Sequence, residues 1–181
     1  MNILDSRVVV TGGASGIGKA LAKAFIKEKS SYVLIVDVDE EKLDETKKEL
    51  NCDALKIDVS KEEEIKSLVD YMNEKTGGID IFCSNAGIGG VPGFFDVSTE
   101  DWQNIWDINV IGHIHAAKHV MPQMLERGNG YLMNTASAAG LLTQIGSAPY
   151  SVTKAAASVS YTHLRAHETR HDLVCRLLLE K

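Results

Sequence analysis

The 181-residue chain is poor in cysteine and proline, with three of each, and aromatic residues make up only 6% of it. Cys52, Cys83 and Cys175 form no paired framework and no Cys-x-x-Cys motif. This pattern argues against a secreted disulfide scaffold, so we expect a protein of the reducing cytoplasm. No apolar run approaches the ~20 residues of a membrane span, and the amino terminus lacks the basic flank and long apolar stretch of a secretory signal.

Positive charge is scarce as well, since 19 Lys and Arg residues stand against 25 Asp and Glu residues, for a net charge of -6. A surface of this sign argues against general binding to nucleic acid or to an anionic membrane. The hydrophobic share of 44% is ordinary for a soluble globular protein, and the length suits one domain with a real core.

What the chain does contain is a regular alternation of short apolar segments and helical patterns. Strands are predicted at 7–11, 31–37, 54–59, 79–87 and 130–137. Helices are predicted at 19–28, 40–50, 61–75 and 99–126. Strands that alternate with helices indicate an α/β fold with a doubly wound, parallel, Rossmann-like sheet, because parallel strands need crossover connections.

The first predicted strand runs directly into TGGASGIG, residues 11–18. In such a turn Gly12 allows the tight bend, Gly16 lets the backbone approach a pyrophosphate, and Gly18 allows close contact between helix and strand. The helix that follows offers free N–H groups to the phosphates. The alternative is a glycine-rich turn without a ligand, but its place between the first strand and the first helix favours dinucleotide binding.

Asp37 closes the second predicted strand, 19 residues after Gly18. A carboxylate at this position can accept hydrogen bonds from the hydroxyls of an adenosine ribose and repels a 2′-phosphate. No Lys or Arg stands at 38–41 to offset that repulsion, so NAD is favoured over NADP. The alternative role for Asp37 is a helix N-cap or a loop acid.

Ser137 ends the fifth predicted strand, and Tyr150 and Lys154 follow in the segment YSVTK. Residues four apart on a helix share a face. A phenol titrates near ~10 in isolation, and a neighbouring ammonium favours its ionised form. Ser137 can hydrogen-bond the oxygen of a substrate. These three residues together predict a catalytic group for proton transfer.

With these motifs the chain resembles the short-chain dehydrogenase/reductase family, in the branch whose loop reads TGxxxGxG, over about residues 5–157. The resemblance implies that Asp58 bonds the adenine amino group, with Val59 beside the ring. It also implies that Asn109 joins Ser137, Tyr150 and Lys154 in a catalytic tetrad by holding a water linked to Lys154. The cofactor site that it implies comprises Gly12, Ser15, Gly16, Ile17, Gly18, Asp37, Asp58, Val59, Asn85, Ala86, Gly87, Tyr150 and Lys154.

Plainer interpretations exist for some of these residues. Asn109 could be an ordinary amide inside the long helix, although Asn has poor helix propensity, and Asp58 could cap the next helix. Three histidines on the long helix are expected to be exposed or at an interface, and its two tryptophans to serve packing or subunit contacts: His113, His115, His119, Trp102 and Trp106.

The end of the chain departs from the family pattern, in which a sixth strand and a Pro-Gly turn follow the Tyr–Lys helix. VSYTHLRAHE (159–168) can be spelled GTC TCT TAT ACA CAT CTC CGA GCC CAC GAG, which resembles a transposase-type sequencing adapter read in frame. DLVCRLLL (172–179) resembles the distal end of the same adapter. We therefore expect an incomplete NAD-binding domain at 1–158 and a non-native tail at 159–181, the alternatives being a genuine short isoform or a pseudogene product.

The histidines of this tail, His163, His167 and His171, are spaced by four, but the adapter origin makes that spacing an accident of codons, and no metal site is expected. The tail also offers no β-branched run to replace the sixth strand. Strand 130–137 would then be an unpaired sheet edge, so we expect the 181-residue chain itself to be a partly folded or aggregating species without activity.

The sequence thus predicts an NAD(P)-dependent oxidoreductase that interconverts a secondary alcohol and a ketone by hydride transfer. Its expected partner is a small-molecule substrate, with no nucleic acid and no membrane, and the resemblance implies a homo-oligomer for the completed enzyme. The alternatives are a cofactor-binding protein on the same fold without turnover, or an inactive truncated fragment.

Overall fold

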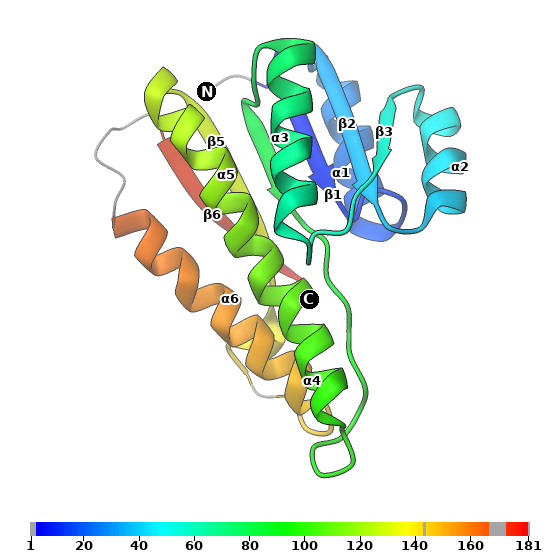
Figure 1. Cartoon of the computed structure of the whole chain (residues 1–181), viewed down its shortest axis with the longest axis vertical. Helices are drawn as coiled ribbons and strands as arrows, with labels where there is room; N and C mark the ends of the chain where they lie inside the picture. The colour runs from blue at the N-terminus through cyan, green and yellow to red at the C-terminus, as the bar shows by residue number, and fades with distance from the viewer. Residues whose placement is uncertain (1–2, 143, 167–172, 181) are drawn as a thin grey trace.

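A computed structural model of the chain describes residues 3–142, 144–166 and 173–180, and beyond residue 160 only the course of the backbone (Figure 1). The tail histidines at 167 and 171 lie outside these ranges. Within the described residues, no helix is both long and apolar enough to cross a membrane.

Six strands form one parallel sheet in the order β3-β2-β1-β4-β5-β6. They are β1 (Arg7–Thr11), β2 (Tyr32–Asp37), β3 (Asp53–Lys56), β4 (Ile81–Ser84), β5 (Gly130–Ser137) and β6 (Leu173–Glu180). The chain moves outward from β1 to β3 and then returns to place β4 on the other side of β1. The carboxyl ends of β1 and β4 therefore flank the switch point at which ligands bind in such sheets. The predicted doubly wound α/β class is confirmed.

The two faces of the sheet carry separate apolar cores, because successive strand residues point to opposite faces. Helices α1 (Gly16–Lys27) and α2 (Glu40–Leu50) cover one face. Helices α3 (Glu62–Thr76) and α5 (Gly112–Arg127) cover the other. On β1, for example, Val8 and Val10 belong to the first core while Val9 belongs to the second.

The single helix predicted at 99–126 is three segments in the structure. Helix α4 (Thr99–Trp106) is capped by Ser98, whose hydroxyl accepts a hydrogen bond from the Asp101 N–H at 3.0 Å. A π-helical turn, η1 (Asp107–Ile111), then leads without a break into α5. After β5, the short 3₁₀ helix η2 (Ala138–Gly140) precedes α6 (Ala148–Ala166), which packs against η2, η1 and α4.

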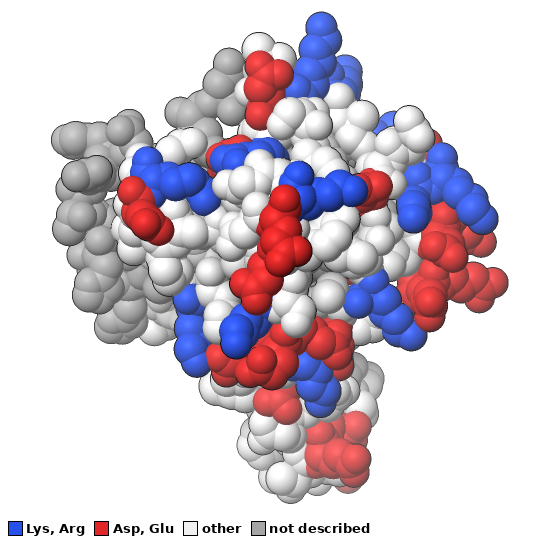
Figure 2. Space-filling model, turned by 45° about the horizontal axis from the view of Figure 1, so that its top comes forward, with Lys and Arg blue, Asp and Glu red and all other residues white. Residues whose placement is uncertain are grey.

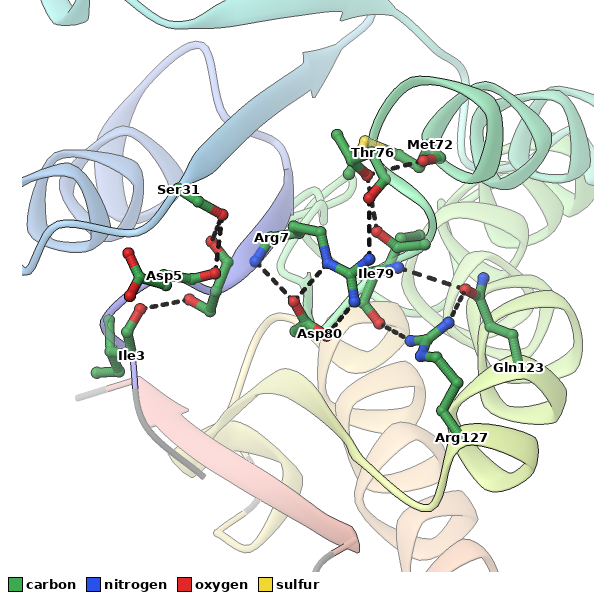
Figure 3. Close-up of polar contacts among 12 residues, drawn as sticks. Ile3, Asp5, Arg7, Ser31, Met72, Thr76, Ile79, Asp80, Gln123 and Arg127 are labelled. Atoms are coloured by element: carbon green, nitrogen blue, oxygen red, sulfur yellow. Dashed lines mark hydrogen bonds and ion pairs between the residues drawn. The ribbon is translucent and has the colours of Figure 1, made fainter.

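A polar cluster at the amino ends of β1 and β4 joins both strands to the helices on one face (Figure 3). The Arg7 guanidinium donates two hydrogen bonds of 2.6 Å to the Asp80 carboxylate and a third, of 2.9 Å, to the Thr76 carbonyl at the end of α3. Arg127 of α5 donates to the Ile79 carbonyl. Burial alone would raise the pKa of Asp80, but the hydrogen bonds from Arg7 outweigh it and hold that pKa below its usual range. This cluster lies at the opposite end of the strands from the switch point.

The expectation that no strand follows the Tyr–Lys helix is wrong. Strand β6 pairs in parallel with β5 over eight positions, from Gly130 opposite Leu173 to Ser137 opposite Glu180. No strand was expected because the middle of the tail is charged and the tail contains no run of β-branched residues. However, LVCRLLLE is itself a short apolar run of the length that suits a buried parallel strand. Strand β5 is therefore not a sheet edge.

Candidate active site

The glycine turn after β1 has the backbone that its sequence predicts. Gly12 and Gly16 both adopt positive φ angles, of 64° and 50°, which L side chains rarely adopt. A Cβ on Gly18 would lie 2.0 Å from the carbonyl oxygen of Gly12, so only glycine fits there. Helix α1 begins at Gly16 rather than at the predicted residue 19, and Ser15 precedes it as N-cap without using its side chain for capping. The exposed first turn of α1 therefore presents backbone N–H groups and a hydroxyl toward solvent.

This turn forms one wall of a cavity of about 310 Å³ at the carboxyl ends of β1, β2 and β4. The volume lies at the lower end of the range for small-molecule and cofactor sites. The structure brings together in its lining eleven residues predicted for the cofactor site: Gly12, Ser15, Gly16, Ile17, Gly18, Asp37, Asp58, Val59, Asn85, Ala86 and Gly87. The other two predicted residues, Tyr150 and Lys154, are not part of this lining.

Asp37 is held at the rim of the cavity by three backbone N–H groups. Its Oδ2 accepts from Ala14 at 3.1 Å, and its Oδ1 accepts from Val38 at 2.8 Å and Asp39 at 3.2 Å. A carboxylate has about four acceptor positions, so these bonds orient Asp37 and leave Oδ2 able to accept from a ligand hydroxyl. The helix-cap alternative does not apply, because the N-cap of α2 is Asp39, which accepts from the Lys42 N–H.

Asp58 and Val59 lie after β3, at the far side of the cavity. The Asp58 carboxylate accepts from the backbone N–H and hydroxyl of Ser60, at 2.9 and 2.7 Å through the same oxygen, Oδ1. Lys61, not Asp58, is the N-cap of α3, so the capping alternative fails here too. Gly112 at the start of α5 approaches Val59 closely, since a Cβ on that glycine would lie 3.0 Å from a Val59 methyl carbon.

A threonine at the end of β1 holds the turn after β4 in place. The Thr11 hydroxyl accepts from the N–H groups of Asn85 and Ala86 at 2.9 and 3.0 Å. The Asn85 amide donates to the Thr11 carbonyl at 3.0 Å and accepts from the Thr135 hydroxyl of β5 at 2.8 Å. These bonds tie β1, β4 and β5 together where their carboxyl ends meet, so they fix the floor of the cavity.

Asn109 sits in the π-helical turn and is completely buried. Its Oδ1 accepts from the Ile88 N–H at 2.8 Å, while its Nδ2 donates to the Ile88 carbonyl at 2.9 Å and to the Thr153 hydroxyl at 3.2 Å. It is therefore no ordinary helix-interior amide, because it links η1 to the loop after β4 and to α6. Single π-helical turns inside α-helices are frequent at functional sites.

Lys154 of α6 reaches back to the end of β5. It is 3% exposed, and its Nζ donates to the Thr135 carbonyl at 3.0 Å while lying 5.7 Å from the centroid of the Tyr150 ring. A Cβ on Gly87 would lie 3.3 Å from this Nζ and 3.1 Å from Asn109 Oδ1. The ammonium, the buried amide and the edge of the cofactor-sized cavity therefore converge.

Ser137 ends β5 one residue before η2, and its Oγ accepts from the Ala139 N–H at 3.2 Å. The approach of η2 to α6 depends on Gly140, because a Cβ there would lie 2.6 Å from the Lys154 carbonyl oxygen. This close packing sets the serine end of β5 against the helix that carries Tyr150 and Lys154.

The expectation that the α5 histidines are exposed or at an interface is wrong for His113 and His115. His113 and His115 are 3% and 9% exposed. The Nδ1 of His113 lies 2.6 Å from the Ser84 hydroxyl, and its Nε2 has no polar partner among the described residues. Burial, with a smaller effect from the Lys154 ammonium, lowers the pKa of His113 to about 3. His119 is half-buried and lies 2.9 Å from Glu62, whose pKa falls to about 2 because Lys118 and His119 both bond it.

Sequence reasoning missed several residues that shape the site. Four apolar side chains also line the cavity: Val38, Ile57, Ile88 and Ile108. Each lies within one residue of a predicted site residue, so adjacency to the motifs would have found them. Thr11 and Thr153 are also adjacent to predicted site residues. Thr135 is not, and the partners of all three threonines are set by the sheet register and by the packing of α6.

The fold and the cavity together define a doubly wound α/β protein with a nucleotide-type site at its switch point. A family profile described as short chain dehydrogenase matches residues 6–175. The chain belongs to the short-chain dehydrogenase family.

Individual relatives agree with this assignment. The chain is 34% identical over 160 residues to the uncharacterized oxidoreductase YvrD of Bacillus subtilis (strain 168), which covers 86% of the chain and 60% of that protein. It is also 34% identical over 160 residues to the uncharacterized oxidoreductase SAR2567 of Staphylococcus aureus (strain MRSA252), covering 86% of the chain and 69% of that protein. The chain thus spans less than two thirds of the length of YvrD.

Solved structures show the same fold. A short-chain dehydrogenase/reductase from Burkholderia phymatum in complex with NAD superimposes with a TM-score of 0.93 at 30% identity, over 99% of this chain and 66% of that one. A levodione reductase superimposes with a TM-score of 0.90 at 27% identity, over 96% of this chain and 70% of that one.

Proposed function

We propose that this chain is an NAD-dependent oxidoreductase that interconverts a secondary alcohol and a ketone. The observation that carries the proposal is the convergence of Lys154, Tyr150 and Asn109 beside a cavity lined by a glycine turn that only glycine can form. The NAD bound to the Burkholderia phymatum relative supports the same reading.

The residues present fit a dinucleotide. The open first turn of α1 would hold the pyrophosphate, since it combines unpaired N–H groups with the positive end of the helix dipole. Asp37 Oδ2 would accept from the adenosine ribose, and its negative charge would repel the 2′-phosphate of NADP. Asp58 and Val59 would meet the adenine, and Lys154 would bind the nicotinamide ribose. NAD is therefore the proposed cofactor in preference to NADP.

The chemistry of the chain's own residues is proton transfer and orientation. The bound nicotinamide supplies the hydride acceptor or donor. In the oxidation direction Tyr150 would take the proton of the substrate hydroxyl, and the Lys154 ammonium, 5.7 Å from the centroid of the Tyr150 ring, would favour the ionised phenol. Ser137 hydrogen-bonds the substrate oxygen. Asn109 holds the loop after β4 and α6 in register, and its segment would position a water toward Lys154.

The alternative is a protein of the same fold that binds the cofactor without turnover. The observation that favours it is that Tyr150 and Lys154 are not part of the lining of the cofactor-sized cavity. Binding alone does not require the buried contacts of Asn109 with Thr153 or of Lys154 with Thr135, which lie outside the cofactor-sized cavity.

A turnover assay separates the two functions. The 181-residue chain is incubated with NAD and a panel of secondary alcohols, and with NADH and the matching ketones, while the ultraviolet absorbance of NADH is followed. NAD binding is measured in parallel by calorimetry. The proposal predicts binding and turnover together. Binding without turnover of any member of the panel would establish the alternative.

A further inference from the structure

Two loops beside the candidate active site are joined into one structure, which we name the two-loop rim: residues 88–97 after β4, and residues 138–142 and 144–148, which lead into α6. The Gly93 N–H donates to the Gly146 carbonyl at 2.8 Å, and the Ala148 N–H donates to the Gly93 carbonyl at 3.3 Å. Gly93 and Ser147 thereby form an isolated parallel bridge. The two loops meet at the lower end of the molecule in Figure 1, next to α4 and the start of α6.

Both loops of the rim start or end at residues of the proposed reaction site. The first leaves the cavity at Ile88, whose backbone is bonded on both sides to the buried amide of Asn109. The second begins directly after Ser137 and ends two residues before Tyr150. A substrate whose reacting oxygen lies between Ser137 and Tyr150 would therefore lie beside the start of both loops of the rim.

The rim exposes large apolar side chains to an unusual degree. The exposed fraction reaches 94% at Phe95 and 98% at Ile145, and four further side chains are well exposed: Val91, Phe94, Leu141 and Leu142. The Phe94 ring lies edge-on to Phe95, with centroids 5.2 Å apart, and to Trp102 of α4, at 6.3 Å. An apolar patch of this kind on a soluble domain marks a ligand or interaction site.

Positive charge is missing from the same part of the molecule. No Lys or Arg occurs in residues 76–117 or 128–153, and the only charged residue of the rim is Asp96. Helix α4 adds Glu100 and Asp101. The part of the molecule that projects at the bottom of Figure 2 accordingly shows Asp and Glu but no Lys or Arg at its lower end. Lys154 is buried and bonded to the Thr135 carbonyl, so a carboxylate or phosphate on the substrate body meets no exposed cation on the described rim.

We propose that the substrate is an uncharged secondary alcohol or ketone whose apolar body lies on the two-loop rim. This inference rests on the proposed function and specifies its substrate class. Burial of an apolar body on the rim is favourable because it removes apolar surface from water. An anionic body would instead face Asp96, Glu100 and Asp101 without a compensating partner. The other possible occupant is a second copy of the chain. A contact between copies would not explain why the rim adjoins Ser137 and Tyr150, whereas a substrate does.

The test compares two substrates of equal length, octan-2-ol and 7-hydroxyoctanoate, which differ in a terminal methyl or carboxylate group. We expect the 181-residue chain with NAD to show a kcat/KM about tenfold or more higher for octan-2-ol. Leu142→Lys should narrow this preference at least about fivefold, mainly through a lower KM for 7-hydroxyoctanoate, because the new ammonium pairs with a remote, non-reacting group. The matched control is Val159→Lys, at an exposed position of α6 about three turns beyond Ser147, which should leave the preference unchanged.

Each other outcome counts against the proposal. Turnover of 7-hydroxyoctanoate at least as efficient as that of octan-2-ol overturns the substrate class while upholding the proposed function. Equal preferences in Leu142→Lys and Val159→Lys remove the rim from substrate recognition. If Leu142→Lys dissociates an oligomer on size-exclusion chromatography and leaves both kcat/KM values unchanged, the rim is a contact between copies. Turnover of neither alcohol rejects the proposed function and this inference together.

Discussion

At the scale of single residues, Asp37 carries the choice of cofactor. Asp37→Ala removes both an acceptor for the ribose hydroxyls and the repulsion of a 2′-phosphate, so NAD binding should weaken about tenfold and the preference for NAD over NADP should narrow. Calorimetric titration of the unmodified chain and the variant with NAD and with NADP measures both affinities. The control is Asp39→Ala, two residues away, which removes a helix cap outside the cavity and should leave the ratio of affinities unchanged. Tighter binding of NADP than of NAD by the unmodified chain would show that Asp37 does not have this role.

His113 should make the stability of the fold depend on pH. Its pKa is lowered to about 3 by burial and by Lys154. Below pH ~6.5, therefore, His113 becomes protonated in the unfolded chain while it stays neutral in the folded chain. Stability conferred by the neutral imidazole is therefore complete above pH ~6.5 and is lost as the pH falls toward 3. Between pH ~6.5 and ~5 the loss should be roughly 1.5–2 kcal/mol.

Denaturant unfolding at several pH values in this window measures that loss. Glutamine cannot titrate, so in His113→Gln the free energy of unfolding should fall less steeply with decreasing pH. The difference in slope should correspond to the uptake of about one proton fewer on unfolding. Parallel declines for the unmodified chain and the variant would mean that His113 is protonated equally in both states.

Some residues of the site could be predicted from the sequence, whereas others could not because their contacts depend on tertiary packing. Gly12, Gly18 and Asp37 could be placed from the sequence because their roles follow from local backbone geometry next to a strand end. The contacts of Thr135 with Asn85, and of Thr153 with Asn109, join residues 50 and 44 positions apart. Such pairs depend on sheet register and helix packing, which the sequence pattern leaves open. The burial of His113 was missed for the same reason.

At the scale of elements, the turn between β1 and α1 depends on one glycine. Gly18→Ala would place a Cβ 2.0 Å from the Gly12 carbonyl oxygen, a backbone atom that cannot move without distorting the turn. We expect a destabilisation of about 1–3 kcal/mol or more and a loss of NAD binding. Gly89→Ala is the control, because nothing lies within 4 Å of a Cβ there and its φ is not positive. Thermal unfolding measures the stability of both variants, and calorimetry measures their NAD affinity. Equal stability and equal NAD affinity of the two variants would contradict the close contact at Gly18.

Element boundaries show where local patterns stop being informative. Strands β1 and β5 and helix α2 begin and end where the apolar periodicity and turn residues predict. The π-helical turn at Asp107–Ile111 interrupts a continuous amphipathic pattern and has no local signal, because it is stabilised by the contacts of Asn109 with Ile88 and Thr153. The motif IN (108–109) marked the place but not the backbone change.

At the scale of the whole molecule, β6 determines whether β5 is paired on both sides or is the edge strand of the sheet. One reason for the predicted aggregation of the 181-residue chain was an unpaired β5 edge, and the pairing of β6 with β5 over eight positions removes that reason. Ending the chain at residue 166 should lower the free energy of unfolding by several kcal/mol, at roughly 0.5–1.5 kcal/mol for each lost hydrogen bond, and should cause aggregation. Equal thermal stability and solubility of the two lengths would show that β6 contributes nothing to the sheet.

The origin of residues 159–181 stays a prediction of its own. The adapter hypothesis concerns the DNA and is compatible with a strand at Leu173–Glu180, because an apolar segment can pair with a sheet edge whatever its source. Sequencing the gene from an independent clone tests it directly. Codons after 158 that depart from the present ones would support an adapter origin, whereas identical codons would establish the tail as native.

The central claim is that Tyr150 transfers the proton in an alcohol–ketone interconversion on a cofactor held elsewhere in the fold. The most direct measurement is therefore Tyr150→Phe, assayed for turnover of a secondary alcohol with NAD and for NAD binding in the same preparation. The variant keeps the aromatic ring near Lys154 and removes only the phenol oxygen. We expect a loss of turnover of at least ~10²-fold, the scale of one acid–base group, with NAD affinity nearly unchanged. Turnover within a few-fold of the unmodified chain would contradict it.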